Sequence, residues 1–234
     1  MARKKSAPAA DSISVELATQ FRRRLHRWYR VHSRDLPWRQ TRDPYRILIS
    51  ELMLQQTQVS RVLDFYRRFL DRFPDLHTLA KARPQRVLDA WEGLGYYARA
   101  RNLHKLAQHV TTTADGIIPS EPEQLRALPG VGAYTAGAVA SFAYEKRAAL
   151  VDTNVARVLQ RVFAPELDPK SGPGLKRLWD MANSLLPRTG KVTWTHNQAL
   201  MELGALVCSA RSPKCGVCPV KRICASVERF EQRP

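Results

Sequence analysis

The stretch RILISELMLQQTQV, residues 46–59, combines the apolar spacing of a buried helix with a single carboxylate. Glu51 has Ile47 and Leu48 one turn before it and Leu54 one turn after it, so a helix would place its side chain on the buried face. Glutamate is rarely buried without a partner or a function. The stretch therefore predicts a helix that enters the core, and it makes Glu51 a candidate functional residue.

Helical periodicity extends over most of the chain and predicts an all-α fold. One apolar helical face comprises Leu17, Phe21, Leu25 and Trp28, and another comprises Val59, Val62, Leu63, Tyr66, Phe69 and Leu70. Asp43 and Pro44 form a helix-start signal before the quoted stretch, and Ser120 with Glu123 has the spacing of a capping box. No segment shows convincing period-two alternation. We expect about ten helices joined by short turns.

The composition indicates a globular protein that binds a polyanion. The chain has 234 residues, 44% of them hydrophobic, and its 38 Lys and Arg against 21 Asp and Glu give a net charge of +17. A sequence pI near 10.3 is typical of nucleic-acid-binding proteins. A ribosome-associated protein or a general basic bias would give the same charge balance.

Membrane insertion and secretion are not indicated by the sequence. No apolar run reaches the roughly 18 residues of a membrane span, and residues 1–12, MARKKSAPAADS, have no hydrophobic segment behind their basic start. We expect an intracellular protein, in the cytoplasm and on the nucleoid, with no membrane partner. Residues 1–12 are expected to form a disordered basic tail.

The cysteines form a ligand cluster near the end of the chain. All 4 lie in the pattern Cys208-x6-Cys215-x2-Cys218-x5-Cys224, and such clustering indicates a metal site rather than a disulfide framework. Structural zinc sites usually have two short-spaced pairs, so the uneven spacing favours an iron–sulfur cluster, with zinc as the alternative. The loop between the first two cysteines carries Arg211 and Lys214, which a cluster could hold against a phosphate backbone.

The segment LPGVGAYTAGAVASFAY, residues 128–144, contains a Pro-Gly-x-Gly turn between two helical stretches. Backbone N–H groups at the start of a helix attract anions. Gly130 and Gly132, with Val131 between them, would let a phosphate approach the backbone closely. A lone Gly-x-Gly is a weak signal, and the alternative is an ordinary helix–helix turn.

Asp152 precedes the helical segment TNVARVLQRVF, residues 153–163, so its default role is that of an N-cap. Glu51 gives it a second interpretation, because two carboxylates, one of them set among apolar residues, can divide acid and stabilising roles at a sugar C1′. Tyr96 stands among basic residues in GLGYYARARNLHK and could stack on bases or pack in the core. The polar run of residues 55–58 predicts a loop that reaches something polar.

These segments, in this order, resemble the helix–hairpin–helix DNA glycosylases of the endonuclease III superfamily, and most of all its adenine glycosylases. The resemblance runs from about residue 34 to residue 224 and rests on LPWR, DPYRILISELMLQQTQV, WEGLGYYARARNLHK, LPGVGAYTAGAVASFAY, VDTNVARVL and the cysteine spacing. It implies two lobes: a six-helix barrel domain with the helix–hairpin–helix at residues 36–146, and a domain of residues 13–35 and 147–234 with one [4Fe–4S] cluster. The active site would lie in the cleft between them and act on a base flipped out of double-stranded DNA.

The resemblance also implies roles for individual residues. Glu51 corresponds to the general acid that protonates adenine N7, a role that burial would favour by raising its pKa. Asp152 corresponds to the carboxylate that stabilises the oxocarbenium-like sugar. The other assignments are Asn154 and Tyr134 beside Asp152; Arg34, Trp38 and Arg39 at the base pocket; Gln56 and Tyr96 inserted into the duplex; Gly130, Val131, Gly132, Arg211 and Lys214 at DNA phosphates; and Cys208, Cys215, Cys218 and Cys224 as cluster ligands.

Tyr134 indicates the type of reaction. Members of the superfamily that also cleave the strand carry a lysine at this position, which forms a Schiff base with C1′. We therefore expect a monofunctional hydrolase without strong AP lyase activity. Adenine glycosylases usually continue past the cluster into a domain that recognises 8-oxoguanine, whereas this sequence ends ten residues after Cys224. Short mismatch glycosylases that remove T or U opposite G also end at the cluster, and they carry a tyrosine at this position.

The expected function is base excision repair. The protein would act as a monomer on double-stranded DNA that contains a mispair or damaged base, and it would remove adenine opposite 8-oxoguanine or guanine by hydrolysing the N-glycosidic bond. One alternative is a thymine or uracil glycosylase that acts on T·G and U·G mismatches. Another is a non-catalytic DNA-binding module with a structural cluster.

Overall fold

A computed structural model describes residues 13–231. Within that range the chain forms 12 α-helices, three short 3₁₀ helices and no strand, so the predicted all-α class is confirmed. None of these helices is long and apolar enough to cross a membrane. The tail predicted for residues 1–12 lies outside the described residues.

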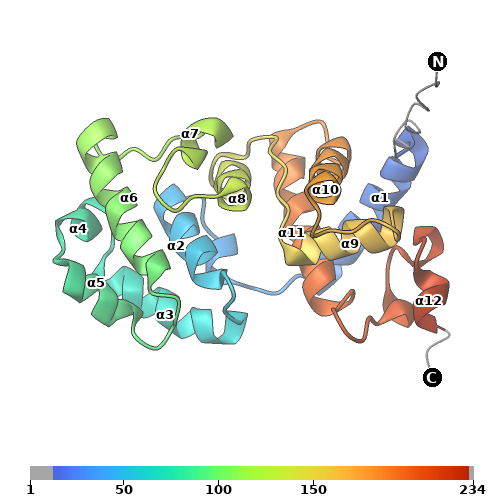
Figure 1. Cartoon of the computed structure of the whole chain (residues 1–234), viewed down its shortest axis with the longest axis horizontal. Helices are drawn as coiled ribbons and strands as arrows, with labels where there is room; N and C mark the ends of the chain where they lie inside the picture. Colours follow the sequence, from blue (N-terminus) through green and yellow to red (C-terminus); the bar gives the residue numbers. More distant parts are fainter. Residues whose placement is uncertain (1–12, 232–234) are drawn as a thin grey trace, which may run out of the picture.

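The helices follow one another with short connections (Figure 1). The α-helices are α1 (Val15–His32), α2 (Pro44–Leu54), α3 (Val59–Arg72), α4 (Leu76–Lys81), α5 (Pro84–Trp91), α6 (Ala98–Ala114), α7 (Pro122–Arg126), α8 (Ala133–Tyr144), α9 (Thr153–Phe163), α10 (Gly172–Ser184), α11 (Gly190–Leu206) and α12 (Val227–Glu231). The 3₁₀ helices are η1 (Pro37–Arg39), η2 (Cys215–Val217) and η3 (Lys221–Ile223).

The helices pack in two groups, which lie to the left and right in Figure 1. Helices α2 to α8 pack on one another, with α2 in contact with α3, α6 and α8. The N-terminal helix α1 packs on α11, which also contacts α9. Helices from near both ends of the chain therefore share one group. The division into residues 36–146 against 13–35 with 147–234 stays a prediction.

Helix α2 carries Glu51 through the middle of the first group. Asp43 caps its start by accepting hydrogen bonds from the backbone N–H groups of Tyr45, at 2.9 Å, and Arg46, at 3.3 Å, and Pro44 supplies the first helical residue. Residues 47–53 are all buried. The predicted helix and its start signal are confirmed, and the helix ends where the polar run of residues 55–58 begins.

Helix α8 is buried on every side and begins directly after the Pro-Gly-x-Gly turn. Residues 135–143 are all buried. A side chain at Gly137 would come within 2.1 Å of the backbone oxygen of Ala149, so only glycine allows the loop before α9 to lie against this helix. Gly130 has φ of 76°, which glycine adopts without strain. The turn thus sets the direction of α8, and the loop packed on α8 leads to Asp152.

The capping box predicted from Ser120 and Glu123 is wrong. Helix α7 begins at Pro122, its N-cap is Glu121, and no side chain caps it. The Ser120 hydroxyl instead donates a 3.3 Å hydrogen bond to the carboxylate of Glu121. Proline favours the first helical position because its ring fixes φ and it lacks the N–H group, so Pro122 sets the start one residue later than the serine would.

Candidate active site

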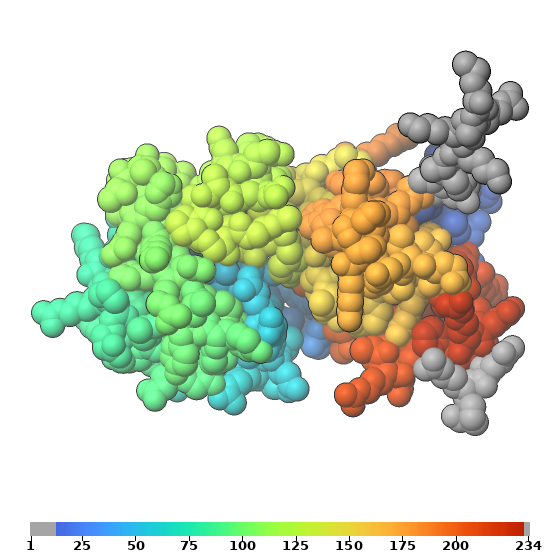
Figure 2. Space-filling model, in the orientation of Figure 1, coloured from blue at the N-terminus to red at the C-terminus, as the bar shows by residue number. Residues whose placement is uncertain are grey.

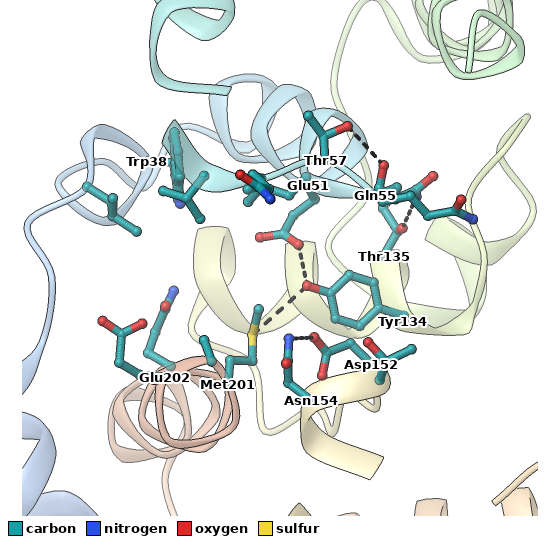
Figure 3. Close-up of a pocket in the computed structure, with 18 of the residues that line it drawn as sticks. Trp38, Glu51, Gln55, Thr57, Tyr134, Thr135, Asp152, Asn154, Met201 and Glu202 are labelled. Atoms are coloured by element: carbon teal, nitrogen blue, oxygen red, sulfur yellow. Dashed lines mark hydrogen bonds between the residues drawn. The ribbon is translucent and has the colours of Figure 1, made fainter. Parts of the chain in front are cut away.

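A cavity of about 770 Å³ opens between the two groups of helices. Figure 2 shows the molecule hollowed in this region, and Figure 3 shows the lining side chains. They come from η1 and the segment before it, α2, the loop after α2, the starts of α3, α8 and α9, and one face of α11. The lining residues are Arg34, Leu36, Trp38, Arg39, Glu51, Leu54, Gln55, Gln56, Thr57, Gln58, Val59, Gly132, Ala133, Tyr134, Thr135, Asp152, Thr153, Asn154, Gln198, Met201, Glu202 and Ala205.

Glu51 is buried in the wall of this cavity, as the helical spacing predicts, and only 2% of the residue is exposed. Its Oε2 accepts a 2.6 Å hydrogen bond from the hydroxyl of Tyr134, whose ring lies across the cavity in Figure 3. Burial, helped by the charge of Asp152, raises the pKa of the Glu51 carboxyl to about 7, although the hydrogen bond from Tyr134 and the charge of Arg39 oppose the rise. Glu51 can therefore hold a proton near neutral pH.

Tyr134 is a fixed donor to Glu51. Burial raises its pKa well above the ordinary value, and the nearby charges of Glu51 and Asp152 act in the same direction. The hydroxyl therefore stays protonated at all moderate pH values. Because the residue is not a lysine, the site offers no amine at this position for a Schiff base.

Asp152 is at once the N-cap of α9 and a wall of the cavity. Its Oδ1 accepts a 2.7 Å hydrogen bond from the backbone N–H of Val155. Its Oδ2 accepts a 2.9 Å hydrogen bond from the side-chain amide of Asn154, and both residues appear beside Tyr134 in Figure 3. The two interpretations from the sequence are thus compatible, because the capping hydrogen bonds hold the carboxylate in place.

A chain of hydrogen bonds joins Asp152 to the cysteine segment. Asn154, which donates to Asp152, accepts a 2.7 Å hydrogen bond from Arg157 through Oδ1. Arg157 also donates to the backbone oxygens of Gly204, at 2.8 Å, and Cys208, at 2.7 Å. The orientation of the Asp152 carboxylate is therefore tied to the backbone at the first cysteine.

Glu202 pairs with both arginines predicted at the base pocket. Its side chain is fully buried, with Oε2 2.6 Å from Arg34 and 2.8 Å from Arg39. Arg39 also donates to the Gln198 side chain at 2.9 Å. Burial alone would raise the pKa of Glu202, but the hydrogen bonds from Arg34 and Arg39 lower it to about 2. Arg34 and Arg39 therefore line the cavity as part of an ionic cluster in which one carboxylate faces two guanidinium groups, so one positive charge remains.

Glu202 was missed by the sequence reasoning, although a signal was present. It lies among Ala199, Leu200 and Leu203 on a buried part of α11, so the test that singled out Glu51 would also have found it. What could not be read from the sequence is its pairing with Arg34, because 168 residues separate the two.

Replacing Glu202 by glutamine is expected to destabilise the fold. The change would leave the buried charge of Arg39 without its partner, which costs about 3 kcal/mol or more in free energy of unfolding at neutral pH. The pKa of Glu202 is about 2 in the folded protein and near 4.5 in the unfolded chain. The ionised carboxylate therefore contributes its full stabilisation above about pH 4.5. The difference between wild type and variant should shrink as pH falls from 4.5 toward 2.

Urea denaturation of both proteins between neutral and acid pH measures this effect. Glu228→Gln is a matched control, because Glu228 is exposed and its substitution should change stability little. A Glu202→Gln protein as stable as the wild type at neutral pH would contradict the importance of the cluster.

Trp38 and the two residues predicted to enter the duplex lie in different surroundings. Trp38 is 6% exposed and lines the cavity, but it also packs edge-on against Tyr66. Gln56 is exposed at the cavity rim. Tyr96 is 59% exposed and does not line the cavity; a separate shallow groove touches Gln56 on one side and Gly95, the neighbour of Tyr96, on the other. Gln56 thus lines both the cavity and the groove, whereas Tyr96 is joined to the groove only through its neighbour Gly95.

The residues predicted at DNA phosphates lie outside the cavity, except for Gly132 at its rim. Gly130 and Gly132 are exposed, whereas Val131 is buried with 7% exposure, so only its backbone remains available to a phosphate. Arg211 and Lys214 are exposed in the loop between Cys208 and Cys215. The structure thus presents the helix start and the cationic loop at the surface.

The four cysteines surround a second, small cavity with apolar walls. It is lined by Val158, Arg161, Val162, Leu203, Val207, Cys208, Pro213, Lys214, Cys215, Cys218, Val220, Cys224 and Phe230. Arg161 lies 3.5 Å from the sulfur of Cys208 and donates to the backbone oxygens of Ser209 and Ala210. Four thiols around an apolar space, with a cation beside one of them, suit an iron–sulfur cluster.

Comparison with known proteins identifies families that match two segments of the chain. Residues 49–183 match the HhH-GPD superfamily of base excision DNA repair proteins, and residues 208–224 match the iron–sulfur binding domain of endonuclease III. The chain is 44% identical over 225 residues to an adenine DNA glycosylase of Rattus norvegicus, covering 92% of this chain and 43% of the relative. It is also 46% identical over 194 residues to the adenine DNA glycosylase of Mycolicibacterium smegmatis, and this match covers 82% of this chain and 65% of the relative.

A solved structure of a thermostable thymine-DNA glycosylase is similar over nearly its whole length. It superposes with a TM-score of 0.82 at 32% identity, covering 91% of this chain and 97% of the other. By contrast, the chain spans less than two thirds of the adenine DNA glycosylases named above.

The fold and the cavity define a two-lobed helix–hairpin–helix protein with a buried acid between its lobes. The chain belongs to the HhH-GPD superfamily of base excision DNA repair proteins. Its cysteine segment is the iron–sulfur binding domain of that lineage, and the cofactor is one [4Fe–4S] cluster, as the spacing favours over zinc.

Proposed function

We propose that this protein is a monofunctional DNA glycosylase that removes adenine mispaired with 8-oxoguanine or guanine. The observation that carries the proposal is Glu51, a buried carboxyl with a pKa of about 7 at the wall of an open cavity. A general acid works best when its pKa lies near the working pH. The choice of adenine is supported by the adenine DNA glycosylases that are 44–46% identical to the chain.

The proposed reaction breaks the bond between C1′ and adenine N9. Glu51 donates its proton to adenine N7, and the bonding electrons leave with the base. The positive charge that develops on the sugar is stabilised by the Asp152 carboxylate. Water then adds to C1′, and its proton returns to Glu51. The hydrogen bond from Tyr134 holds Glu51 in position. The iron–sulfur cluster, when bound, would stabilise the fold of the cysteine segment.

Double-stranded DNA with a mispair or damaged base is the proposed partner, bound by a monomer inside the cell. The net charge of +17 supports a polyanion partner. Arg211, Lys214 and the turn at Gly130–Gly132 are the proposed phosphate contacts, and all but Val131 are exposed. Affinity should then fall steeply with salt, because phosphate contacts release counterions.

Excision of thymine or uracil opposite guanine is the second candidate. It is supported by the similarity to a thymine-DNA glycosylase over 97% of that chain. A pyrimidine lacks N7, so Glu51 would then position water or the base instead. A third candidate, a DNA-binding module without catalysis, would not need a carboxyl with a raised pKa.

A panel of duplexes separates the candidates. Holoprotein is incubated with A·8-oxoG, A·G, A·C, T·G and U·G duplexes, followed by alkaline cleavage. We expect the A·8-oxoG and A·G duplexes to be cut, and borohydride to trap no substantial covalent complex because Tyr134 replaces the lysine. Cutting of T·G and U·G alone would favour the second candidate, and cutting of none would favour the third.

Replacing Tyr134 by phenylalanine is expected to move the pH profile. Glu51 must be protonated to act, so the single-turnover excision rate should fall as pH rises through about 7. The Tyr134 hydrogen bond lowers the pKa of Glu51, and hydrogen bonds to charged groups are worth about 1.5–3 kcal/mol. In a plot of excision rate against pH, the fall in rate should therefore occur about one pH unit higher for the variant than for the wild type. A fall that stays in place or moves to lower pH would show that Glu51 is not the group titrated.

A further inference from the structure

Arg99, in the first turn of α6, is a buried cation that the proposed reaction does not use. The residue is 7% exposed. In the described range it forms no ion pair with a carboxylate. Burying a charge without a counter-charge is costly unless many hydrogen bonds compensate it. The contacts of its guanidinium therefore indicate what the residue is for.

The guanidinium binds the end of α2 on one side. One terminal nitrogen donates to the backbone oxygens of Leu52 and Met53, both at 2.8 Å, and of Gln55, at 2.6 Å. These are carbonyls of the last turn of α2, where the helix carries partial negative charge. Arg99 thus caps the helix that carries Glu51.

The other side of the guanidinium binds the loop before α6. The second terminal nitrogen donates to the backbone oxygens of Leu94, at 3.4 Å, and Gly95, at 3.0 Å, and to the Thr57 hydroxyl at 3.3 Å. One side chain therefore joins two loops that are about forty residues apart in the sequence.

The two loops each contain one non-glycine residue with left-handed backbone. Gln56 has φ of 54° and Tyr96 has φ of 50°. Such residues persist only when their surroundings hold them. Arg99 bonds the residues on both sides of Gln56 and the residue directly before Tyr96. Its guanidinium also lies 5.4 Å from the centre of the Tyr96 ring.

We infer that Arg99 is a positioning residue that holds Gln56 and Tyr96 as one unit, so that both enter the duplex together and open it around the target base. The inference rests on the proposed function, and on the insertion of these two residues into the duplex that the family resemblance implies. An arginine is required because its planar fork reaches acceptors on two sides at once, whereas lysine offers a single point charge.

The test measures opening of the duplex separately from excision. An A·G duplex carries 2-aminopurine next to the mispaired adenine, and its fluorescence rises when the stack opens. Proteins in a Glu51→Gln background are compared with and without Arg99→Met, and the single substitutions are assayed for single-turnover excision. Arg86→Met, which removes an exposed cation on α5, is the matched control for loss of charge.

We expect Arg99→Met to lose most of the fluorescence rise and about tenfold or more of the excision rate, because small displacements in a site are worth up to about 100-fold. Its affinity for the duplex should stay within about threefold of the control, since phosphate contacts dominate binding. Arg99→Lys should recover only part of the rise. If Arg99→Met proves unfolded by circular dichroism, the lysine variant supplies the test.

Two outcomes would overturn the inference: an undiminished fluorescence rise in Arg99→Met, or complete recovery in Arg99→Lys, which would mean that charge alone suffices. Failure of the proposed function looks different, because the wild-type protein would then cut no duplex whether or not it opens the stack.

Discussion

Replacing Glu51 by glutamine is expected to reduce excision by about 100- to 10,000-fold, the usual contribution of a general acid. Glutamine has nearly the same shape and can still accept the hydrogen bond from Tyr134, but it has no proton to give to the base. Binding to a mispaired duplex should be unchanged. The measurement is single-turnover cleavage of A·8-oxoG and A·G duplexes, together with a binding titration.

The same substitution is expected to relieve a cost in stability at high pH. The pKa of Glu51 is about 7 in the folded protein and near 4.5 in the unfolded chain. Folding therefore opposes ionisation of this group, and the stability of the wild type is lost progressively as pH rises through that range. The free energy of unfolding of the variant, relative to that of the wild type, should therefore rise by about 3 kcal/mol between pH 4.5 and pH 8.

Both halves of this prediction can fail. Rapid excision by Glu51→Gln would remove the residue from the reaction, whatever its pKa. A stability difference that does not change with pH would mean that the buried carboxyl does not titrate near neutrality. Glu228→Gln, an exposed change of the same type, should leave both excision and the pH dependence of stability as in the wild type.

Replacing Asp152 by asparagine is expected to reduce excision by about 100- to 1,000-fold, the range for loss of one electrostatic contact to a transition state. Asparagine caps helices about as well as aspartate, so it should keep the hydrogen bond from Val155 and the start of α9. The negative charge that faces the sugar is lost. Excision and thermal unfolding of the same protein are the two measurements.

Asp75→Asn is the matched control, because Asp75 also caps a helix, accepting a 2.7 Å hydrogen bond from Thr78 at the start of α4, and lies outside the cavity. Both variants should unfold near the wild-type temperature, and only Asp152→Asn should lose excision. A large loss of stability in Asp152→Asn with normal excision would leave Asp152 only its role as a cap.

Much of the site could be predicted because its signals are local. Glu51 breaks the apolar face of one helix, the cysteines lie within one short segment, and the Pro-Gly-x-Gly turn precedes a helix that is apolar all round. Each of these signals depends on spacing within a few turns, which the sequence displays directly. The resemblance to a family then joined the local signals into one site.

The errors and omissions arose where two local preferences competed or where partners were distant. The capping box predicted at Ser120 is wrong because Pro122 is the stronger helix-start signal. Arg34 and Arg39 were recognised, but Glu202, which pairs with both, was not. In the sequence, Arg99 could not be distinguished from the other basic residues near it. Its acceptors are backbone oxygens, which are present whatever the side chains are.

The sequence alone determined the helices, the cluster ligands and the presence of a carboxylate on a buried face, because each depends on residue type and short-range spacing. Only the tertiary structure decided that Glu51, Tyr134 and Asp152 line one cavity, that Glu202 pairs with both arginines, and that Arg99 joins the loops of Gln56 and Tyr96. The reason is physical: the raised pKa of Glu51 comes from removal of water and from neighbours on other helices, which exist only once the two groups of helices have packed.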